Sequence, residues 1–223
     1  MNFTKTHENI VIIIVIAAAF FLWNSIILFP LKLIPVIFHE MAHVIAALAT
    51  GGYQISVQIT NDLGGITSSK ASNEIVVLTA GYAGSVIFGS AIYYSALKPK
   101  ILRPASAAIS VLFLAFGLIF IKNEFGIIAS LSIALFFGAI FFIKNQTVLT
   151  LILKIIALIN ISYVINDVIY DTFLSTNIYS DAVRLEQITG FNDWLWGALW
   201  IAVALIALLL IMKNMLNYRT KKK

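Results

Sequence analysis

Five consecutive residues early in the chain have the types and the spacing of a metal centre that activates water: His39, Glu40, Met41, Ala42 and His43. On an α-helix, residues four apart share a face, so the two imidazoles can bind one ion. Glu40 lies one step around the helix, beside the position that a water ligand would take. Zinc lowers the pKa of such a water toward about 7, and a carboxylate can accept its proton. The pattern predicts His39 and His43 as metal ligands and Glu40 as the general base.

These ionisable residues lie in a chain that is otherwise strongly apolar. Of its 223 residues, 61% are hydrophobic and 11% are charged, against roughly 45–50% and about 25% in ordinary globular domains. A soluble protein of this size cannot bury so much apolar surface, so the composition excludes a water-soluble enzyme, a disordered chain and a nucleic-acid-binding domain. The absence of cysteine excludes disulfides, thiolate zinc sites and cysteine nucleophiles. Because ionisable groups inside a membrane are costly, those that occur there are functional by default.

Seven apolar runs approach the length of roughly 20 residues that a membrane-spanning helix needs. They cover residues 9–29, 34–50, 74–97, 104–121, 125–143, 147–170 and 194–212. After the second run, residues 51–70 alternate polar and apolar side chains and contain turn signals, which predicts a short hairpin. The sequence therefore predicts an all-α polytopic membrane protein with about six to seven transmembrane helices and a short β-hairpin after the HExxH helix.

The basic residues predict the orientation of the chain. Five of the fifteen Lys and Arg lie in residues 213–223, a tail that we expect in the cytoplasm. Seven spans then place ten basic residues on the cytoplasmic side and four on the other; the ten are the tail together with Lys32, Lys98, Lys100, Arg103 and Lys144. Lys154, inside the sixth span, is expected to snorkel to its inner end. We expect one integral-membrane domain over residues 1–223, with an N-terminal helix in 1–30, a catalytic core in 31–200 and the basic tail.

The motifs around the HExxH pattern resemble those of the site-2 protease family of intramembrane zinc metalloproteases, in particular its compact site-2-protease-like branch. The resemblance covers about residues 31–200 and rests on PVIFHEMAHVIAALATGG (35–52), GGITSS (64–69), LTAGYAGSVIFG (78–89) and NDVIYDTFLSTNIYSDAVRLEQITG (166–190), followed by Trp196-Gly197. It implies zinc-dependent cleavage of a membrane-protein substrate within its transmembrane segment, with His39 and His43 as ligands and Glu40 as base. The expected setting is a bacterial cell membrane with the C-terminus cytoplasmic. The lipid bilayer and the substrate are the expected partners, nucleic acid is not, and no pattern indicates an oligomeric state.

A catalytic zinc of this type needs a third protein ligand, usually His or a carboxylate. His7 precedes the first span, so an acid must serve. In the family the ligand is the Asp of a Leu-Asp-Gly motif, and the sequence Ser-Asp-Ala at 180–182 resembles it, which implies Asp181. Asp167 and Asp171 stay open as rivals, because they lie four residues apart near the end of the sixth span. Their alternative role is hydrogen bonding to neighbouring spans.

In the seven-span topology, Asp181 and His39 are expected at different depths in the membrane, although both are candidate ligands of one ion. This topology places Asp181 in an outer loop, whereas His39 lies near the inner end of its span. Either the loop folds inward or the HExxH helix begins deeper than its hydropathy indicates. Irregular backbone at membrane depth is tolerated only where protein or a water-filled cavity covers it.

Two further features allow a functional and a structural interpretation. The hairpin at 51–70 can hold an extended substrate by strand addition, or it can cap the end of the HExxH helix. In the third span, Gly81, Gly84 and Gly89 favour close helix packing and are interpreted as scaffold.

Two function classes fit these observations. The first is the zinc metallopeptidase that the resemblance implies. The second is a membrane metal-binding protein or a metal or proton transporter that uses the same His and Asp residues. Glu40, between the two His, favours the peptidase, because a pure binding site does not need it.

Overall fold

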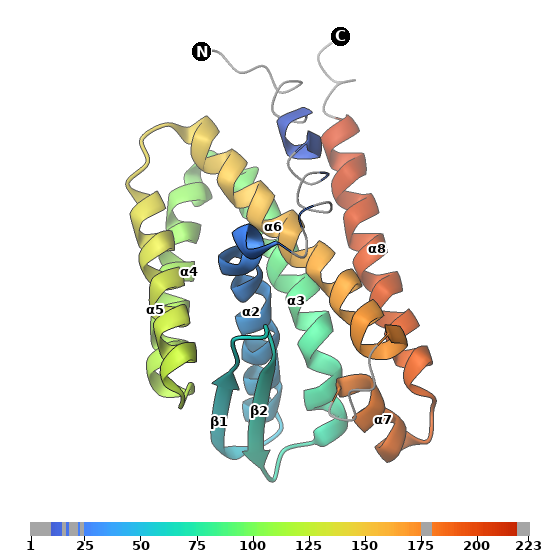
Figure 1. Ribbon diagram of the computed structural model, residues 1–223. Coiled ribbons are helices and arrows are strands. Elements are labelled where there is room, and N and C mark those ends of the chain that lie inside the picture. Colours follow the sequence, from blue (N-terminus) through green and yellow to red (C-terminus); the bar gives the residue numbers. More distant parts are fainter. Residues whose placement is uncertain (1–9, 15–16, 18–21, 23–24, 175–179, 218–223) are drawn as a thin grey trace.

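The computed structural model describes residues 10–14, 17, 22, 25–174 and 180–217. Within them, six helices are long and apolar enough to cross a membrane, and two strands form one antiparallel hairpin. Figure 1 shows this arrangement of packed helices with the small sheet at one side. The predicted fold class is confirmed, with six spans among the described residues. The predicted first span, residues 9–29, lies in part outside them.

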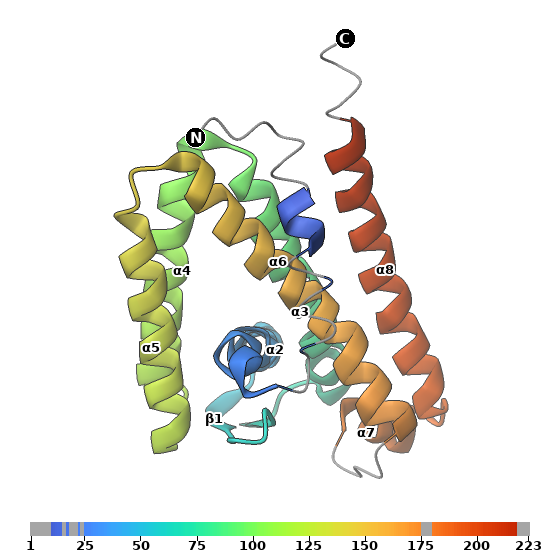
Figure 2. The same ribbon diagram turned by 45° about the horizontal axis from the view of Figure 1, so that its top comes forward.

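The HExxH helix, α2 (Phe29–Ala49), is the central element, and most of its residues are buried. In Figure 2 it lies between the α4–α5 pair and the α3–α6 pair. A 3₁₀ turn, η1 (Ile26–Leu28), leads into it, so the helix begins five residues before the predicted start at 34. Pro30 lies in its first turn, where a missing N–H costs nothing. Pro35 lies inside the helix, where tight packing against neighbouring helices makes its missing hydrogen bond tolerable.

This earlier start changes the depth of the HExxH motif. His39 lies ten residues after Phe29 and ten residues before Ala49, at the centre of α2. At a rise of 1.5 Å per residue, each end of the helix is about 15 Å away. The expectation that His39 lies near the inner end of its span is therefore wrong. The HExxH helix begins earlier than its hydropathy indicates, which was one of the two ways to resolve the conflict of depths.

Two lysines lie elsewhere than expected. Lys32, expected in a cytoplasmic segment, is a residue of α2 and is only 8% exposed. Lys154 is 7% exposed within α6, and its Nζ lies 5.9 Å from the centroid of the Tyr93 ring. A cation near an aromatic face is stabilised by the ring quadrupole, so Lys154 is held inside the protein and does not snorkel.

The predicted hairpin consists of β1 (Tyr53–Ile59) and β2 (Gly65–Lys70), in which Val57 pairs with Thr67. The other edge of β1 is also occupied. The backbone N–H of Val57 donates to the carbonyl of Phe120 at 2.9 Å, and the N–H of Lys122 donates to the carbonyl of Val57 at 2.9 Å. The Asn123 side chain bonds both backbone groups of Ile59. The hairpin is thus fixed to the turn between α4 and α5.

The remaining helices surround α2 and carry the rest of the site. They are α3 (Glu74–Ala96), α4 (Pro99–Ile119), α5 (Glu124–Phe141), α6 (Gln146–Ile169), α7 (Asp181–Thr189) and α8 (Asp193–Asn217). Asn73 caps α3 and Asn145 caps α6, each by accepting backbone N–H bonds. A π-helical turn, η2 (Tyr170–Leu174), continues α6. The short helix α7 packs on α3 and α8, at the lower end of the molecule in Figure 1.

Candidate metal centre

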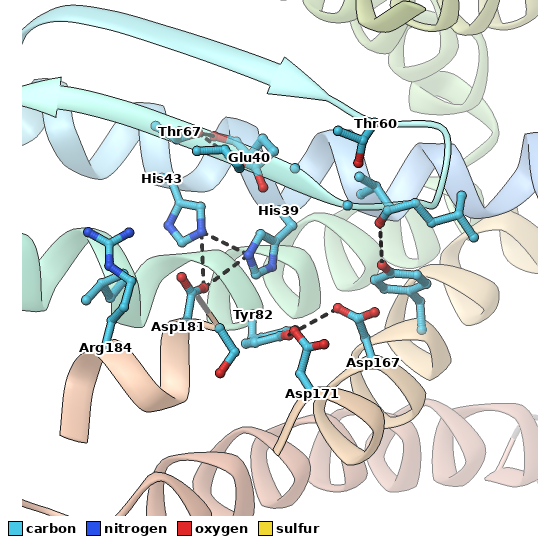
Figure 3. A pocket seen from close by; sticks show the side chains of 18 of the residues that line it. His39, Glu40, His43, Thr60, Thr67, Tyr82, Asp167, Asp171, Asp181 and Arg184 are labelled. Atoms are coloured by element: carbon cyan, nitrogen blue, oxygen red, sulfur yellow. Dashed lines mark hydrogen bonds and ion pairs between the residues drawn. The ribbon is translucent and has the colours of Figure 1, made fainter. Parts of the chain in front are cut away.

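Three side chains that are far apart in the sequence meet beside the centre of α2. The Nε2 atoms of His39 and His43 lie 2.9 Å apart, and Oδ2 of Asp181 lies 3.1 Å from each of them. Figure 3 shows the two imidazoles and the carboxylate facing one another. Among the described residues, these three form the group of His and acidic side chains that could hold a metal ion. The structure thus places Asp181 with the two His of the motif.

Helix α3 orients the His43 ring. Its Nδ1–H donates to the carbonyl of Val77 at 2.7 Å, so the lone pair of the neutral ring lies on Nε2 and points into the three-residue group. The His39 ring packs edge-on against Tyr82, with the ring centroids 4.5 Å apart. Tyr82 in turn packs against Trp200 of α8 at 4.8 Å. Helix α3 therefore holds both imidazoles in place, through Val77 and Tyr82, and α8 supports Tyr82 through Trp200.

Asp181 reaches the imidazoles from the first turn of α7, whose N-terminal end lies beside them. Ser180 caps this helix by accepting a hydrogen bond from the N–H of Val183. Gly190 ends it with a φ of +76°, a backbone conformation that glycine adopts without strain. Arg184, one turn after Asp181, donates to a carboxylate oxygen of Glu74 at 2.5 Å and links α7 to the start of α3. With Asp181 in contact with His39 at the centre of α2, the two residues lie at the same depth.

The surroundings of Asp181 favour its ionised form. Burial raises the pKa of this carboxyl, but the positive charge and the hydrogen bonds of His43 and His39, when these rings are protonated, outweigh the effect and lower that pKa well below its ordinary value. A carboxylate that stays ionised is a ligand for a divalent cation.

Glu40 lies under the hairpin. Its side chain is almost fully buried, with the residue 3% exposed, and its Oε2 accepts a hydrogen bond from the Thr67 hydroxyl at 2.6 Å. Gly65 lies against the other oxygen, since a Cβ at that position would be 2.3 Å from Oε1. The side chain of the predicted general base, which projects from α2, is therefore covered and held by β2.

The rival acids line the same pocket but face another partner. Asp167 and Asp171 each place a carboxylate oxygen near the Tyr82 hydroxyl, at 3.1 Å and 3.4 Å. In Figure 3 both point toward Tyr82. Tyr82 belongs to α3 and Asp167 to α6, so these acids match the alternative role, hydrogen bonding between neighbouring spans.

A pocket of about 390 Å³ contains all of these groups. Its lining includes the HExxH side chains, Asp181, and residues 64–67 of the hairpin. A cavity of this size holds several water molecules, whose share of liquid volume is about 30 Å³ each. The site thus has the space for water that hydrolysis inside a membrane protein requires.

The three ligand atoms fit a tetrahedral divalent ion. Zinc binds His nitrogen and carboxylate oxygen at about 2.0–2.2 Å, which separates tetrahedral ligand atoms by about 3.4 Å. The observed separations of 2.9 Å and 3.1 Å are a few tenths of an ångström shorter. Two neutral imidazoles with one carboxylate are a zinc ligand set that leaves a fourth position open.

The glycines of α3 divide into two kinds. A Cβ on Gly84 would lie 2.3 Å from the Cβ of Ala42, and one on Gly89 would lie 2.7 Å from Cγ1 of Ile161, so these two serve helix packing as predicted. A Cβ on Gly81 would instead lie 2.5 Å from Cε1 of His39 and 2.6 Å from Cε1 of His43. Gly81 is thus part of the site, a role that its interpretation as scaffold missed.

Gly81→Ala is expected to displace both imidazoles and to lower zinc affinity by about 10- to 100-fold, the effect typical of losing ligand orientation. The measurement is a zinc titration of the purified protein. Gly138→Ala is the matched control, because within the described structure a Cβ there would meet Ser110 Oγ, at 3.2 Å, and no imidazole. Equal zinc affinity in the two variants would show that the imidazoles move freely and that Gly81 is not part of the site.

The comparison with family models matches residues 12–211 to the family described as peptidase M50B-like. Searches of curated proteins and of solved structures returned no match for the chain. The family match covers 200 of the 223 residues, counted from 12 to 211, and includes all three candidate ligands and Glu40. It agrees with the resemblance to site-2 proteases. The chain belongs to the peptidase M50B-like family.

Proposed function

We propose that the protein is an intramembrane zinc metalloendopeptidase. It hydrolyses peptide bonds in or near the transmembrane segments of membrane-protein substrates, as in regulated intramembrane proteolysis. The observation that carries this proposal is the meeting of His39, His43 and Asp181 at the mid-depth of a central span, beside a buried glutamate.

The residues of the chain divide the chemistry among them. His39, His43 and Asp181 hold the zinc ion, which when bound supplies a Lewis acid for the scissile carbonyl and makes water more acidic. Glu40 accepts a proton from the attacking water and donates it to the leaving amine nitrogen, acting first as general base and then as general acid. The donor set and the burial of Glu40 support these roles.

The hairpin supports a substrate that binds in extended form. Its strand β1 is paired with β2 on one side and with the segment around Ile121 on the other. In the described part of the chain, β2 pairs only with β1, so its second edge can accept a strand. A transmembrane helix must unwind before its peptide bond reaches the metal, and strand addition would stabilise the unwound form. Because β2 also covers Glu40, the hairpin would shield the base and offer a binding edge at the same time.

We place this protein in a bacterial cell membrane with the C-terminus in the cytoplasm. With the C-terminus assigned to the cytoplasm and the buried Lys32 left out, the proposed topology assigns nine basic residues (ten minus one) to the cytoplasmic side and four to the other. This bias supports the proposed orientation.

Removal of the metal tests the proposal. The purified protein, reconstituted in liposomes with a single-span substrate, is expected to lose at least about 10-fold in cleavage rate after chelation and to recover when zinc is added. Product peptides are measured by mass spectrometry. Cleavage that persists in protein shown to be zinc-free would contradict the proposal.

The same liposomes test the second function, metal or proton transport. Asp167, Asp171 and Tyr82 favour it, because they extend the polar lining of the pocket beyond the three ligands. Zinc or proton flux across the liposome membrane without any peptide hydrolysis would support a transporter in place of a peptidase.

A further inference from the structure

Strand β2 holds the Glu40 side chain with two of its residues. The Thr67 hydroxyl donates to Oε2 at 2.6 Å, and Gly65 lies against Oε1. Residues two apart in a strand face the same side. The exposure of β2 alternates accordingly, with Ile66 and Ser68 exposed and Thr67 partly buried. One face of β2 is therefore directed at Glu40, and within it Thr67 supplies the hydrogen bond.

The position of Thr67 is itself fixed from outside the hairpin. Thr67 pairs with Val57 across the sheet, and Val57 forms a bridge with Ile121 on its other side. Val57 is fully buried, and two backbone bonds of 2.9 Å fix it to the turn between α4 and α5. Strand β2, strand β1 and the segment around Ile121 thus lie side by side. Thr67 lies in the outer strand of the three, next to Glu40. The backbone of Thr67 therefore cannot shift to follow the carboxylate if the carboxylate turns away.

A buried carboxylate needs such a donor. An unpartnered polar atom in an apolar setting is destabilising, and the side chain would adopt another rotamer to find a partner. A general base works only within about 2.6–3.2 Å of the proton that it accepts. A rotation of Glu40 about its side-chain bonds would therefore remove it from the reaction without affecting the metal ligands.

We propose that Thr67 is a positioning residue for Glu40, holding the carboxylate in the rotamer that reaches the attacking water. This role rests on the proposed function. In this role Thr67 acts through the orientation of the base and not on the reacting atoms themselves. The predicted signature is a loss in kcat without a matching change in KM or in zinc content.

The test compares Thr67→Val, which replaces the hydroxyl with a methyl group of similar size, with Thr67→Ser, which keeps the hydroxyl. Thr67→Val is expected to lower kcat by about 10- to 100-fold, the cost of misplacing a catalytic group by about an ångström, with KM within about twofold. Thr67→Ser is expected to restore most of kcat. Thr79→Val is the matched control, because among the described residues that hydroxyl donates to the carbonyl of Ile75 within its own helix, at 2.7 Å.

A spectroscopic readout separates positioning from a general loss of structure. The infrared carboxylate band of Glu40, isolated by subtracting the spectrum of Glu40→Gln, is expected to shift in Thr67→Val and to stay in place in Thr79→Val. A wild-type kcat in Thr67→Val would overturn the role, as would a rise in KM alone. If Glu40→Gln cleaves as fast as the wild type, the proposed base fails; if only Thr67→Val does, the base stands and the positioning role fails.

Discussion

Glu40→Gln is expected to lower kcat for a membrane-tethered substrate by about 10²- to 10⁴-fold, the range that general acid–base catalysis contributes. Glutamine has nearly the same shape, and its amide oxygen can still accept the Thr67 hydroxyl, but it cannot take up a proton. The fold and the zinc content are therefore expected to stay unchanged. The measurement is the rate of product formation in reconstituted liposomes, with bound zinc determined on the same sample.

Glu124→Gln is the matched control for this substitution. Glu124 is an exposed residue in the first turn of α5 and does not line the pocket. It is expected to leave kcat unchanged. Full activity of Glu40→Gln beside an unchanged control would refute the proposed mechanism, and zinc flux that survives in it would support the transporter.

Asp181→Ala is expected to lower zinc affinity by more than the 10- to 100-fold that outer-shell changes cost, because it removes one of three ligands. Asp167→Ala and Asp171→Ala are expected to keep stoichiometric zinc, since both carboxylates face the Tyr82 hydroxyl. Zinc is measured by elemental analysis of the purified variants. His43→Ala serves as the positive control for loss of metal.

The opposite result would reassign the third ligand. If Asp181→Ala retains stoichiometric zinc while Asp167→Ala loses it, the third ligand lies on α6. The 3.1 Å contacts of Asp181 with the imidazoles would then be ion pairs and not part of a metal site. Loss of zinc in both variants would indicate that the Tyr82 cluster also supports the metal.

The parts of the site that the sequence predicts are those with local spacing. His39 and His43 lie on one helix face because they are four residues apart, and the hairpin follows from its alternating residues. Asp181 could be chosen over Asp167 and Asp171 only through the family resemblance. All three acids lie more than 120 residues after the motif, so their placement depends on how the chain folds after α6.

Other features could not be predicted because they arise from tertiary contacts. The early start of α2 is not evident from the sequence, because Pro30 and Lys32 interrupt the apolar run there, whereas in the structure the proline fits a first helical turn and the lysine is buried. Gly81 has the same sequence signature as Gly84, and only the position of the imidazoles distinguishes them. The Gly-rich segment at 64–69 was a signal for the hairpin but not for the contact between Thr67 and Glu40.

The central position of His39 in α2 determines how long the products of a cut would be. A substrate segment that is severed at that depth, about 15 Å from either surface of the helix span, leaves about ten residues on each side of the broken bond. A peptide needs roughly twice that length to remain embedded as a helix across the hydrocarbon layer. Under the proposed function, both remnants would then be shorter than a full span, so a single cut would weaken the anchoring of the domains on both sides of the membrane.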